Sequence, residues 1–87
     1  MDASVNIRVE CSDNPGTRQT VIQLLRHGKA RDIRENKLSN CMEIQASYYV
    51  EDNSFDRLEE IADLIKLQGG VYQVEMLENH NMVKQNR

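Results

Sequence analysis

Apolar and polar residues alternate at every second position in two stretches of this chain, residues 4–11 and 42–50. Neighbouring side chains of a strand point to opposite faces of a sheet, so the alternation predicts two half-buried β-strands. Residues 71–77, rich in valine and tyrosine, predict a further strand. The apolar face of the first strand comprises Val5, Ile7, Val9 and Cys11. The apolar face of the second comprises Met42, Ile44, Ala46, Tyr48 and Val50.

Two other stretches place apolar residues at spacings of three and four, the period of an amphipathic helix. Residues 17–26 form the first, which Gly28 ends. The second follows a cap at Asn53 or Ser54 and ends at the glycine pair 69–70. The apolar side of the first helix comprises Val21, Ile22, Leu24 and Leu25. The apolar side of the second comprises Phe55, Leu58, Ile61, Ala62 and Ile65.

The stretch between the first helix and residues 42–50 is rich in charge, and Ile33 and Leu38 are its main apolar members. Residues 29–37 therefore predict an outer strand or an extended loop instead of a central strand. As an outer strand, residues 29–39 would expose backbone groups with which a second chain could pair to continue the sheet.

The predicted order of elements is strand, helix, strand, strand, helix, strand. One-sided helices and strands of this kind pack best as two helices on one face of an antiparallel sheet, and right-handed crossovers leave few alternatives. The predicted fold class is α+β, a ferredoxin-like βαββαβ domain with a four-stranded antiparallel sheet. The domain spans residues 1–77, and the polar residues 78–87 are predicted to be a disordered tail. The open sheet face is then polar and comprises Asn6, Arg8, Glu10, Glu43, Gln45, Ser47 and Tyr49.

Composition narrows the class of protein further. The 87 residues are 39% hydrophobic and 29% charged, as in a single folded domain, and the net charge of −3 gives no field that attracts nucleic acid or an anionic membrane. The first residues lack the basic and apolar regions of a signal peptide, and no stretch approaches the ~18–20 apolar residues of a membrane span. The predicted location is cytoplasmic, at the cytosolic face of a membrane if a parent chain is anchored there.

The cysteines and histidines form no recognisable chemical site. Cys11 and Cys41 lie far apart without a CxxC pair, which argues against a zinc or redox site and favours small residues in or near the core. A disulfide between them is the less favoured alternative, because it needs an oxidising compartment. No motif brings His27 or His80 near a nucleophile, so we expect no catalytic residue, no cofactor and no metal, and the chain is not predicted to be an enzyme.

The same order of elements occurs in RNA-recognition modules, which stack bases on aromatic side chains of the two central strands. At those positions the first strand of this chain presents Asn6, Arg8 and Glu10, and the third strand presents only Tyr49. Nucleic acid is therefore not a predicted partner.

Two short segments carry a family resemblance. Residues 13–16 (Asp-Asn-Pro-Gly) lead from a strand into an amphipathic helix, and residues 69–74 (Gly-Gly-Val-Tyr-Gln-Val) lead into the last strand. Together with the order of elements, they resemble an ACT domain. The resemblance implies a regulatory domain, often paired with a second copy, that in many members binds an amino acid near the first turn. It places Asn14, Pro15 and Gly16 beside the ligand, whereas the residue types by themselves favour a tight turn chosen for its backbone geometry.

Two departures from the ACT pattern leave a second family open. Residues 17–19 (Thr-Arg-Gln) replace the small or apolar residues that usually follow the turn, and residues 28–31 (Gly-Lys-Ala-Arg) replace a glycine-asparagine segment. The chain is also similar to the soluble C-terminal domain of MgtC/SapB-type membrane proteins. That resemblance implies a ligand-free interaction or assembly module. Its partners would be a second copy or other domains of a parent chain, and it would meet a membrane only through that parent.

Overall fold

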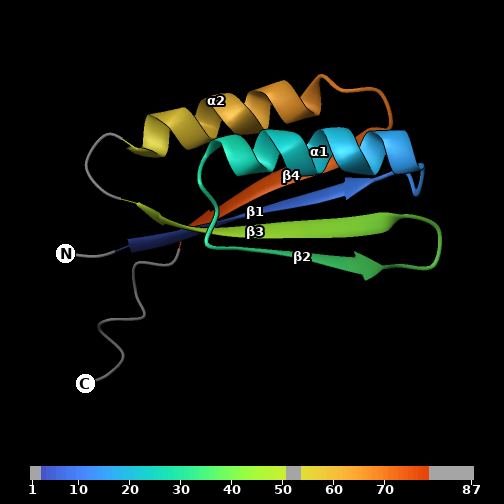
Figure 1. Ribbon diagram of the computed structural model, residues 1–87, viewed down its shortest axis with the longest axis horizontal. Helices are drawn as coiled ribbons and strands as arrows, with labels where there is room; N and C mark the ends of the chain where they lie inside the picture. The colour runs from blue at the N-terminus through green and yellow to red at the C-terminus, as the bar shows by residue number, and fades with distance from the viewer. Residues whose placement is uncertain (1–2, 51–53, 79–87) are drawn as a thin grey trace.

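The computed structural model describes residues 3–50 and 54–78, which form six elements in the predicted order. They are β1 (Ala3–Cys11), α1 (Pro15–His27), β2 (Asp32–Lys37), β3 (Met42–Val50), α2 (Ser54–Lys66) and β4 (Val71–Glu78). The strands form one sheet in the order β2-β3-β1-β4, and every neighbouring pair is antiparallel. Both helices lie on one face of this sheet (Figure 1), so the predicted α+β ferredoxin-like fold is confirmed.

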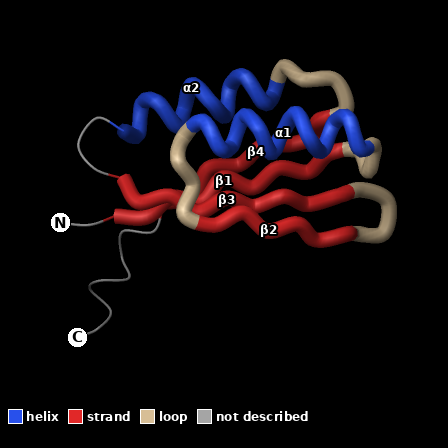
Figure 2. Tube along the Cα trace, in the orientation of Figure 1, coloured by secondary structure: helices blue, strands red, loops and turns tan. Residues whose placement is uncertain are grey.

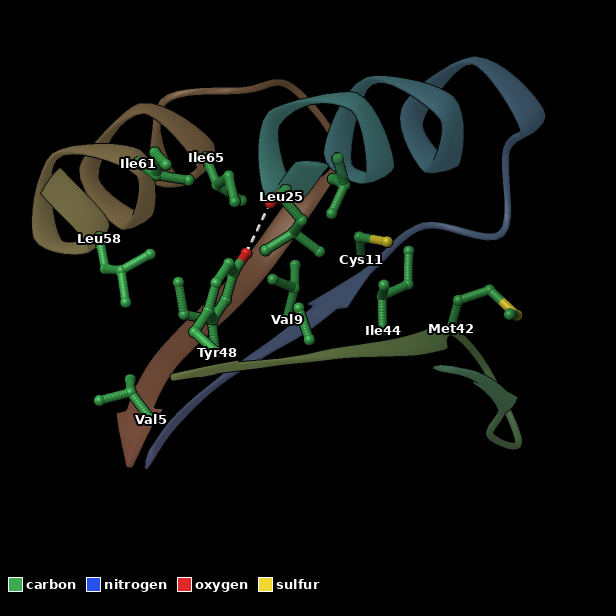
Figure 3. Packing of buried hydrophobic residues seen from close by; sticks show 13 residues of the cluster. Val5, Val9, Cys11, Leu25, Met42, Ile44, Tyr48, Leu58, Ile61 and Ile65 are labelled. Atoms are coloured by element: carbon green, nitrogen blue, oxygen red, sulfur yellow. Dashed lines mark hydrogen bonds between the residues drawn. The ribbon is translucent and has the colours of Figure 1, made fainter. Parts of the chain in front are cut away.

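The hydrophobic core lies between the helix layer and the sheet, which Figure 2 shows as two separate layers. The alternating residues of β1 and β3 point toward the helices, as their pattern predicted, and meet the apolar sides of α1 and α2 (Figure 3). The buried apolar side chains are Val5, Ile7, Val9, Cys11, Val21, Leu25, Met42, Ile44, Ala46, Tyr48, Leu58, Ile61, Ala62 and Ile65.

Helix α1 begins at Pro15, two residues before its predicted start. The side chain of Asn14 caps the helix, because its Oδ1 accepts hydrogen bonds from the backbone N–H groups of Gly16 (2.8 Å) and Thr17 (3.3 Å). A proline fits the first helical position, where a backbone N–H has no partner within the helix. Of the three residues predicted to form a tight turn, Asn14 caps the helix, and Pro15 and Gly16 belong to it.

The charged stretch before β3 forms a true edge strand, β2, in which Ile33 is half-buried and the other five residues are exposed. At the opposite edge, β4 extends to Glu78, one residue beyond the predicted domain boundary. The register between β1 and β4 shifts between Glu10 and Cys11, so Tyr72 is an additional residue at a bulge. The rest of the predicted tail, residues 79–87, lies outside the described residues.

The end of α1 is locked onto β3 by one buried hydrogen bond, drawn in Figure 3. The Tyr48 hydroxyl donates to the backbone carbonyl of Leu25 (2.7 Å), and burial raises the pKa of the Tyr48 phenol, which keeps it a donor. Gly28 closes the helix where a Cβ atom would lie 2.9 Å from Leu58 and from Tyr48. A side chain at this position would require the side chains of Leu58 and Tyr48 to shift.

Neither α1 nor α2 has the length and apolarity needed to cross a lipid bilayer, and no other helix occurs among the described residues.

Candidate functional site

The turn between β1 and α1 is held by one backbone hydrogen bond to a neighbouring loop and one hydrogen bond within the turn. The N–H of Ser12 donates to the carbonyl of Gly70 (2.7 Å), which joins this turn to the loop before β4. The Ser12 hydroxyl in turn accepts a hydrogen bond from the N–H of Asn14 (3.2 Å). Gly70 has a φ of +88°, and a Cβ atom there would lie 2.7 Å from the Thr17 hydroxyl oxygen. The turn and the loop before β4 therefore support each other.

The three residues that the ACT resemblance places beside a ligand, Asn14, Pro15 and Gly16, lie together at the exposed N-terminus of α1. The carbonyl oxygen of the Asn14 side chain is already engaged in capping the helix. A shallow depression beside it is lined by Pro15, Arg18, Gln19 and Ile22. The local contacts account for Asn14 as a cap, and contact of these residues with a ligand stays a prediction.

Charged side chains beside this turn tie α1 to the edge strand β2. The Arg18 guanidinium contacts Glu35 (2.6 Å) and lies 3.8 Å from Asp13, while the Lys37 ammonium contacts Asp13 (2.6 Å). The hydrogen bond from Lys37 holds the pKa of the Asp13 carboxyl below its usual value. The charges that a bound amino acid would need at this end of the sheet are therefore paired within the chain.

The open face of the sheet centres on Arg8, which contacts three carboxylates. Its guanidinium donates to Glu43 on β3, to Glu10 on β1 (2.7 Å) and to Glu75 on β4 (3.5 Å). The hydrogen bond from Arg8 lowers the pKa of the Glu43 carboxyl, and the bond to Glu43 raises the pKa of Arg8. Sequence reasoning predicted a polar face here and missed this cluster. The only available signal was the alternation of Arg8 with Glu10, because the partners on β3 and β4 depend on strand register.

Aromatic stacking is also restricted on this face. The guanidinium of Arg31 lies 4.0 Å from the centroid of the Tyr49 ring, so one side of that ring is covered by the chain itself. At the neighbouring position on the same face of β3, the Ser47 hydroxyl donates a hydrogen bond to the Asn6 side chain (2.7 Å). The open face is thus occupied largely by contacts among its own side chains.

The cysteine and histidine side chains that could take part in chemistry do not form a common site among the described residues. Cys11 is buried and Cys41 half-buried, both are free thiols, and burial raises the pKa of Cys11, which disfavours the reactive thiolate. His27 lies in a shallow groove between the helices beside Leu24 and Leu64. Within residues 3–50 and 54–78, no group of three or more histidine, cysteine or acidic side chains is arranged to hold a metal ion.

The two edges of the sheet differ in their side chains. Strand β2 carries Asp32, Arg34, Glu35 and Lys37, all exposed. Strand β4 is largely apolar, with exposed fractions of 64% for Tyr72 and 50% for Leu77. A groove runs between α2 and β4, and its lining residues are Glu59, Ala62, Asp63, Lys66, Val74 and Met76.

No family model matches this chain, and no curated protein matches it. Solved structures do resemble it. The crystal structure of the ACT domain from the GTP pyrophosphokinase of Chlorobium tepidum has a TM-score of 0.71 and 22% identity, covering 88% of this chain and 100% of that one. The C-terminal domain of the MgtC protein from Mycobacterium tuberculosis has a TM-score of 0.75 and 20% identity, covering 88% and 87%.

Both families named from the sequence are therefore structural neighbours of this chain. A de novo designed protein is also similar, with a TM-score of 0.63 and 14% identity over 91% of this chain and 97% of its own. Because natural and designed sequences share this fold, the likeness establishes the ACT-like fold and leaves the function to be argued from the surfaces.

Proposed function

We propose that this chain is a non-enzymatic regulatory domain of ACT-like fold that acts by pairing with a second copy of itself. The observation that carries the proposal is the contrast between its polar surfaces and its sheet edges. The charged groups at the first turn and on the open face are engaged with one another, through Arg18 and Arg8 respectively. The outer sides of β2 and β4 have no neighbouring strand among the described residues.

Sheet edges favour pairing because each presents a row of backbone donors and acceptors in fixed geometry. A second strand satisfies these groups together and needs no pocket. A two-stranded contact between identical domains also produces a closed dimer, the commonest symmetric assembly of soluble proteins. A regulatory output then follows from association, since any domain attached to one copy is brought close to its counterpart.

The test is the mass of the purified domain in solution, measured by sedimentation equilibrium across the micromolar to millimolar range. We expect the mean mass to rise with concentration toward that of a dimer. A monomer at every concentration would contradict the proposal. Circular dichroism on the same samples confirms that the domain is folded throughout.

Amino-acid sensing is the second candidate, favoured by the ACT-like turn at Asn14, Pro15 and Gly16. A ligand present at 100 times its dissociation constant adds about 2.7 kcal/mol of stability, which raises the midpoint of thermal unfolding by roughly 10 °C or more. We would therefore screen the twenty amino acids by thermal unfolding. If none shifts the midpoint, sensing of amino acids is excluded.

The matched variant for this screen is Asn14→Ser. Serine also caps helices, so the variant keeps the start of α1 while it removes the side-chain amide. A ligand that binds at the turn through this amide should shift the variant less than the wild type. An equal shift in both proteins would place the ligand away from Asn14.

A further inference from the structure

We propose that the groove between α2 and β4 binds an extended segment of another protein, in which a basic residue stands two positions before an apolar one. The segment pairs antiparallel with β4 beside Val74 and Met76, and its basic side chain lies against Glu59 and Asp63 on α2. The inference goes beyond self-association, because it gives this groove a partner other than a second copy. It rests on four features of the described residues: backbone direction, exposed apolar surface, unpaired charges and the size of the groove.

The direction of the backbone groups at this edge follows from one hydrogen bond of the neighbouring strand. The N–H of Ser12 donates to the carbonyl of Gly70, so Ser12 directs its backbone toward the β4 side of β1. Backbone direction alternates along a strand. Glu10 and Arg8, two and four positions before Ser12, therefore also direct their N–H and C=O groups toward β4.

On β4, the outward backbone groups belong to Val74 and Met76. Gln73 and Glu75 oppose Glu10 and Arg8 of β1, so they direct their backbone groups toward that strand. Val74 and Met76 alternate with them and direct their N–H and C=O groups away from β1. Both follow the bulge at Tyr72, so a strand beside them meets a regular row of donors and acceptors. An extended segment can pair with such a row.

The apolar side chains of β4 are less covered than their partners on the neighbouring strand. Val74 opposes Val9, and Met76 opposes Ile7, on the helix side of the sheet. Val9 and Ile7 are fully buried, whereas Val74 and Met76 are half-buried, because no described strand lies on their outer side. The buried Ala62 of α2 lines the same groove. An apolar group placed there removes this surface from water, which favours binding.

The charged side chains of α2 that line the groove have no ionic partner. Glu59, Asp63 and Lys66 make no ion pair with another described residue, whereas Arg8 and Arg18 are each paired with carboxylates. Helix α2 and strand β4 run in opposite directions (Figure 1), so Lys66 lies near the start of β4 and Glu59 lies toward its end. The groove therefore has a basic end and an acidic end.

The size and walls of the groove fit single side chains better than a small molecule. Its volume is about 280 Å³, just below the ~300–1,000 Å³ of pockets that hold small ligands. A strand added to β4 directs every second side chain to the helix side of the sheet. The side chains opposite Val74 and Met76 therefore enter the groove. An extended segment uses the outward backbone groups and the groove together, whereas a small molecule uses only the groove.

The charges determine the order of side chains in the segment. Every neighbouring pair in this sheet is antiparallel, and parallel pairing is slightly less stable, so the segment runs antiparallel to β4. Its residue opposite Met76 then precedes its residue opposite Val74. A lysine or arginine at the first position packs its stem on Met76 and directs its charge to Glu59 and Asp63. The second position is apolar, because a cation there would approach Lys66.

A synthetic peptide with this order tests the site on the intact domain. The probe is acetyl-Thr-Thr-Lys-Thr-Val-Thr-Thr-amide, titrated into isotope-labelled domain while the backbone amide resonances are followed by NMR. We expect saturable shifts at the N–H groups of Val74 and Met76 and no shifts along β2. The absence of shifts at millimolar peptide, or shifts confined to other surfaces, would overturn the proposal.

Two methylated forms of the peptide test backbone pairing without changing the protein. A methyl group on the backbone nitrogen of the lysine removes the N–H that is directed at Met76. A methyl group on the central threonine nitrogen removes an N–H that is directed away from the sheet. We expect the first form to lose binding and the second to retain it. Equal binding of both forms would overturn pairing along β4.

Asp63→Lys tests the position of the basic residue by the sign of its effect. Asp63 is exposed on α2, and circular dichroism confirms that the variant folds. The lysine peptide should bind the variant about 2- to 10-fold more weakly than the wild type. A peptide with glutamate in place of lysine should bind the variant more tightly than the wild type. The same change in dissociation constant for both peptides would overturn the proposed placement.

Sedimentation equilibrium of the unlabelled domain separates this proposal from self-association. A monomer at every concentration that binds the lysine peptide would overturn self-association and leave the peptide site standing. A dimer that does not bind the peptide would overturn the peptide site and leave self-association standing.

Discussion

The two edge strands of the sheet differ in length, exposure and charge. Strand β2 is short, exposed and charged at Asp32, Arg34, Glu35 and Lys37, whereas β4 is longer and presents Val74 and Met76 beside the exposed ring of Tyr72. Topology makes both strands edges, but only the side chains decide whether an edge resists a partner. The two edges of one antiparallel sheet can therefore differ in charge and exposure, because their side chains are independent of the topology.

The same contrast extends to the helix beside each edge. Helix α1 holds β2 through exposed ion pairs, since Arg18 contacts Glu35 and Lys37 contacts Asp13 at the turn before the helix. Helix α2 is held over β4 by apolar contacts, in which Ile65 is fully buried and Val74 and Met76 pack against the core. Exposed ion pairs contribute little to stability, whereas buried apolar groups contribute most of it. We therefore expect substitutions on the β4 side to have the larger effects.

The largest effect is expected for Ile65→Ala. The substitution removes a fully buried side chain between α2 and the sheet and should reduce the free energy of unfolding by about 2–5 kcal/mol. Urea denaturation followed by circular dichroism measures this loss. Leu67→Ala is the control, because Leu67 is 79% exposed and its truncation should change stability by less than about 0.5 kcal/mol. Equal losses in both variants would refute apolar packing as the basis of this side.

The second-largest loss of stability is expected for Gly70→Ala, in the loop that precedes β4. The positive φ of Gly70 and the close approach of its missing Cβ to Thr17 should make alanine cost about 1–3 kcal/mol in unfolding free energy. The neighbouring Gly69 offers a matched control, since a Cβ atom there meets nothing within 4 Å. If thermal unfolding shows the same midpoint for Gly70→Ala and Gly69→Ala, the contact between this loop and α1 is unimportant.

Arg8→Met tests the open face, which joins β4 to the central strands. The variant leaves three carboxylates without their shared cation and should lower stability at neutral pH by about 1–2 kcal/mol. Arg34→Met is the control, because Arg34 lies on the same open face, on the edge strand β2, with an exposed side chain that pairs with its near neighbour Asp32. A loss in Arg34→Met as large as that in Arg8→Met would contradict a special role for the cluster.

The same cluster has a defined pH dependence. Because the pKa of Glu43 is lowered in the folded state, its ionised form stabilises the fold above the unfolded-state pKa of about 4.3. This stabilisation is lost as the pH falls through the lower folded-state pKa. Arg8→Met should therefore show a shallower loss of stability in acid than the wild type, measured by urea denaturation at a series of pH values. Parallel profiles would count against the Arg8–Glu43 contact.

The smallest effect is expected for Arg18→Gln on the β2 side. Its partners Glu35 and Asp13 are exposed, so the loss should be smaller than in the three variants above and should disappear at high salt, where exposed charges are screened. Thermal unfolding at low and high ionic strength measures both properties. A large loss that persists at high salt would show that β2 depends on Arg18 for more than exposed ion pairs.

Local pattern was sufficient to predict β3 in full and β1 to within one residue, because alternation is a property of neighbouring residues. The start of α1 was predicted two residues late, since the capping bonds of Asn14 to Gly16 and Thr17 allow Pro15 and Gly16 to enter the helix. The turn was predicted from residue types that serve equally well as a helix cap and first turn. Residue type alone therefore did not distinguish the two.

The sequence by itself determined the order of elements and the buried faces of β1 and β3, because each depends on periodicities within one segment. That order, combined with the rule of right-handed crossovers, was sufficient to predict the ferredoxin-like arrangement. Only the tertiary structure decided which carboxylates surround Arg8, since Glu43 and Glu75 reach it through the registers of strands far apart in the chain. It likewise decided that β4 and α2 share a groove beside an apolar edge. Contacts between distant segments depend on how whole elements pack, and no local pattern contains that information.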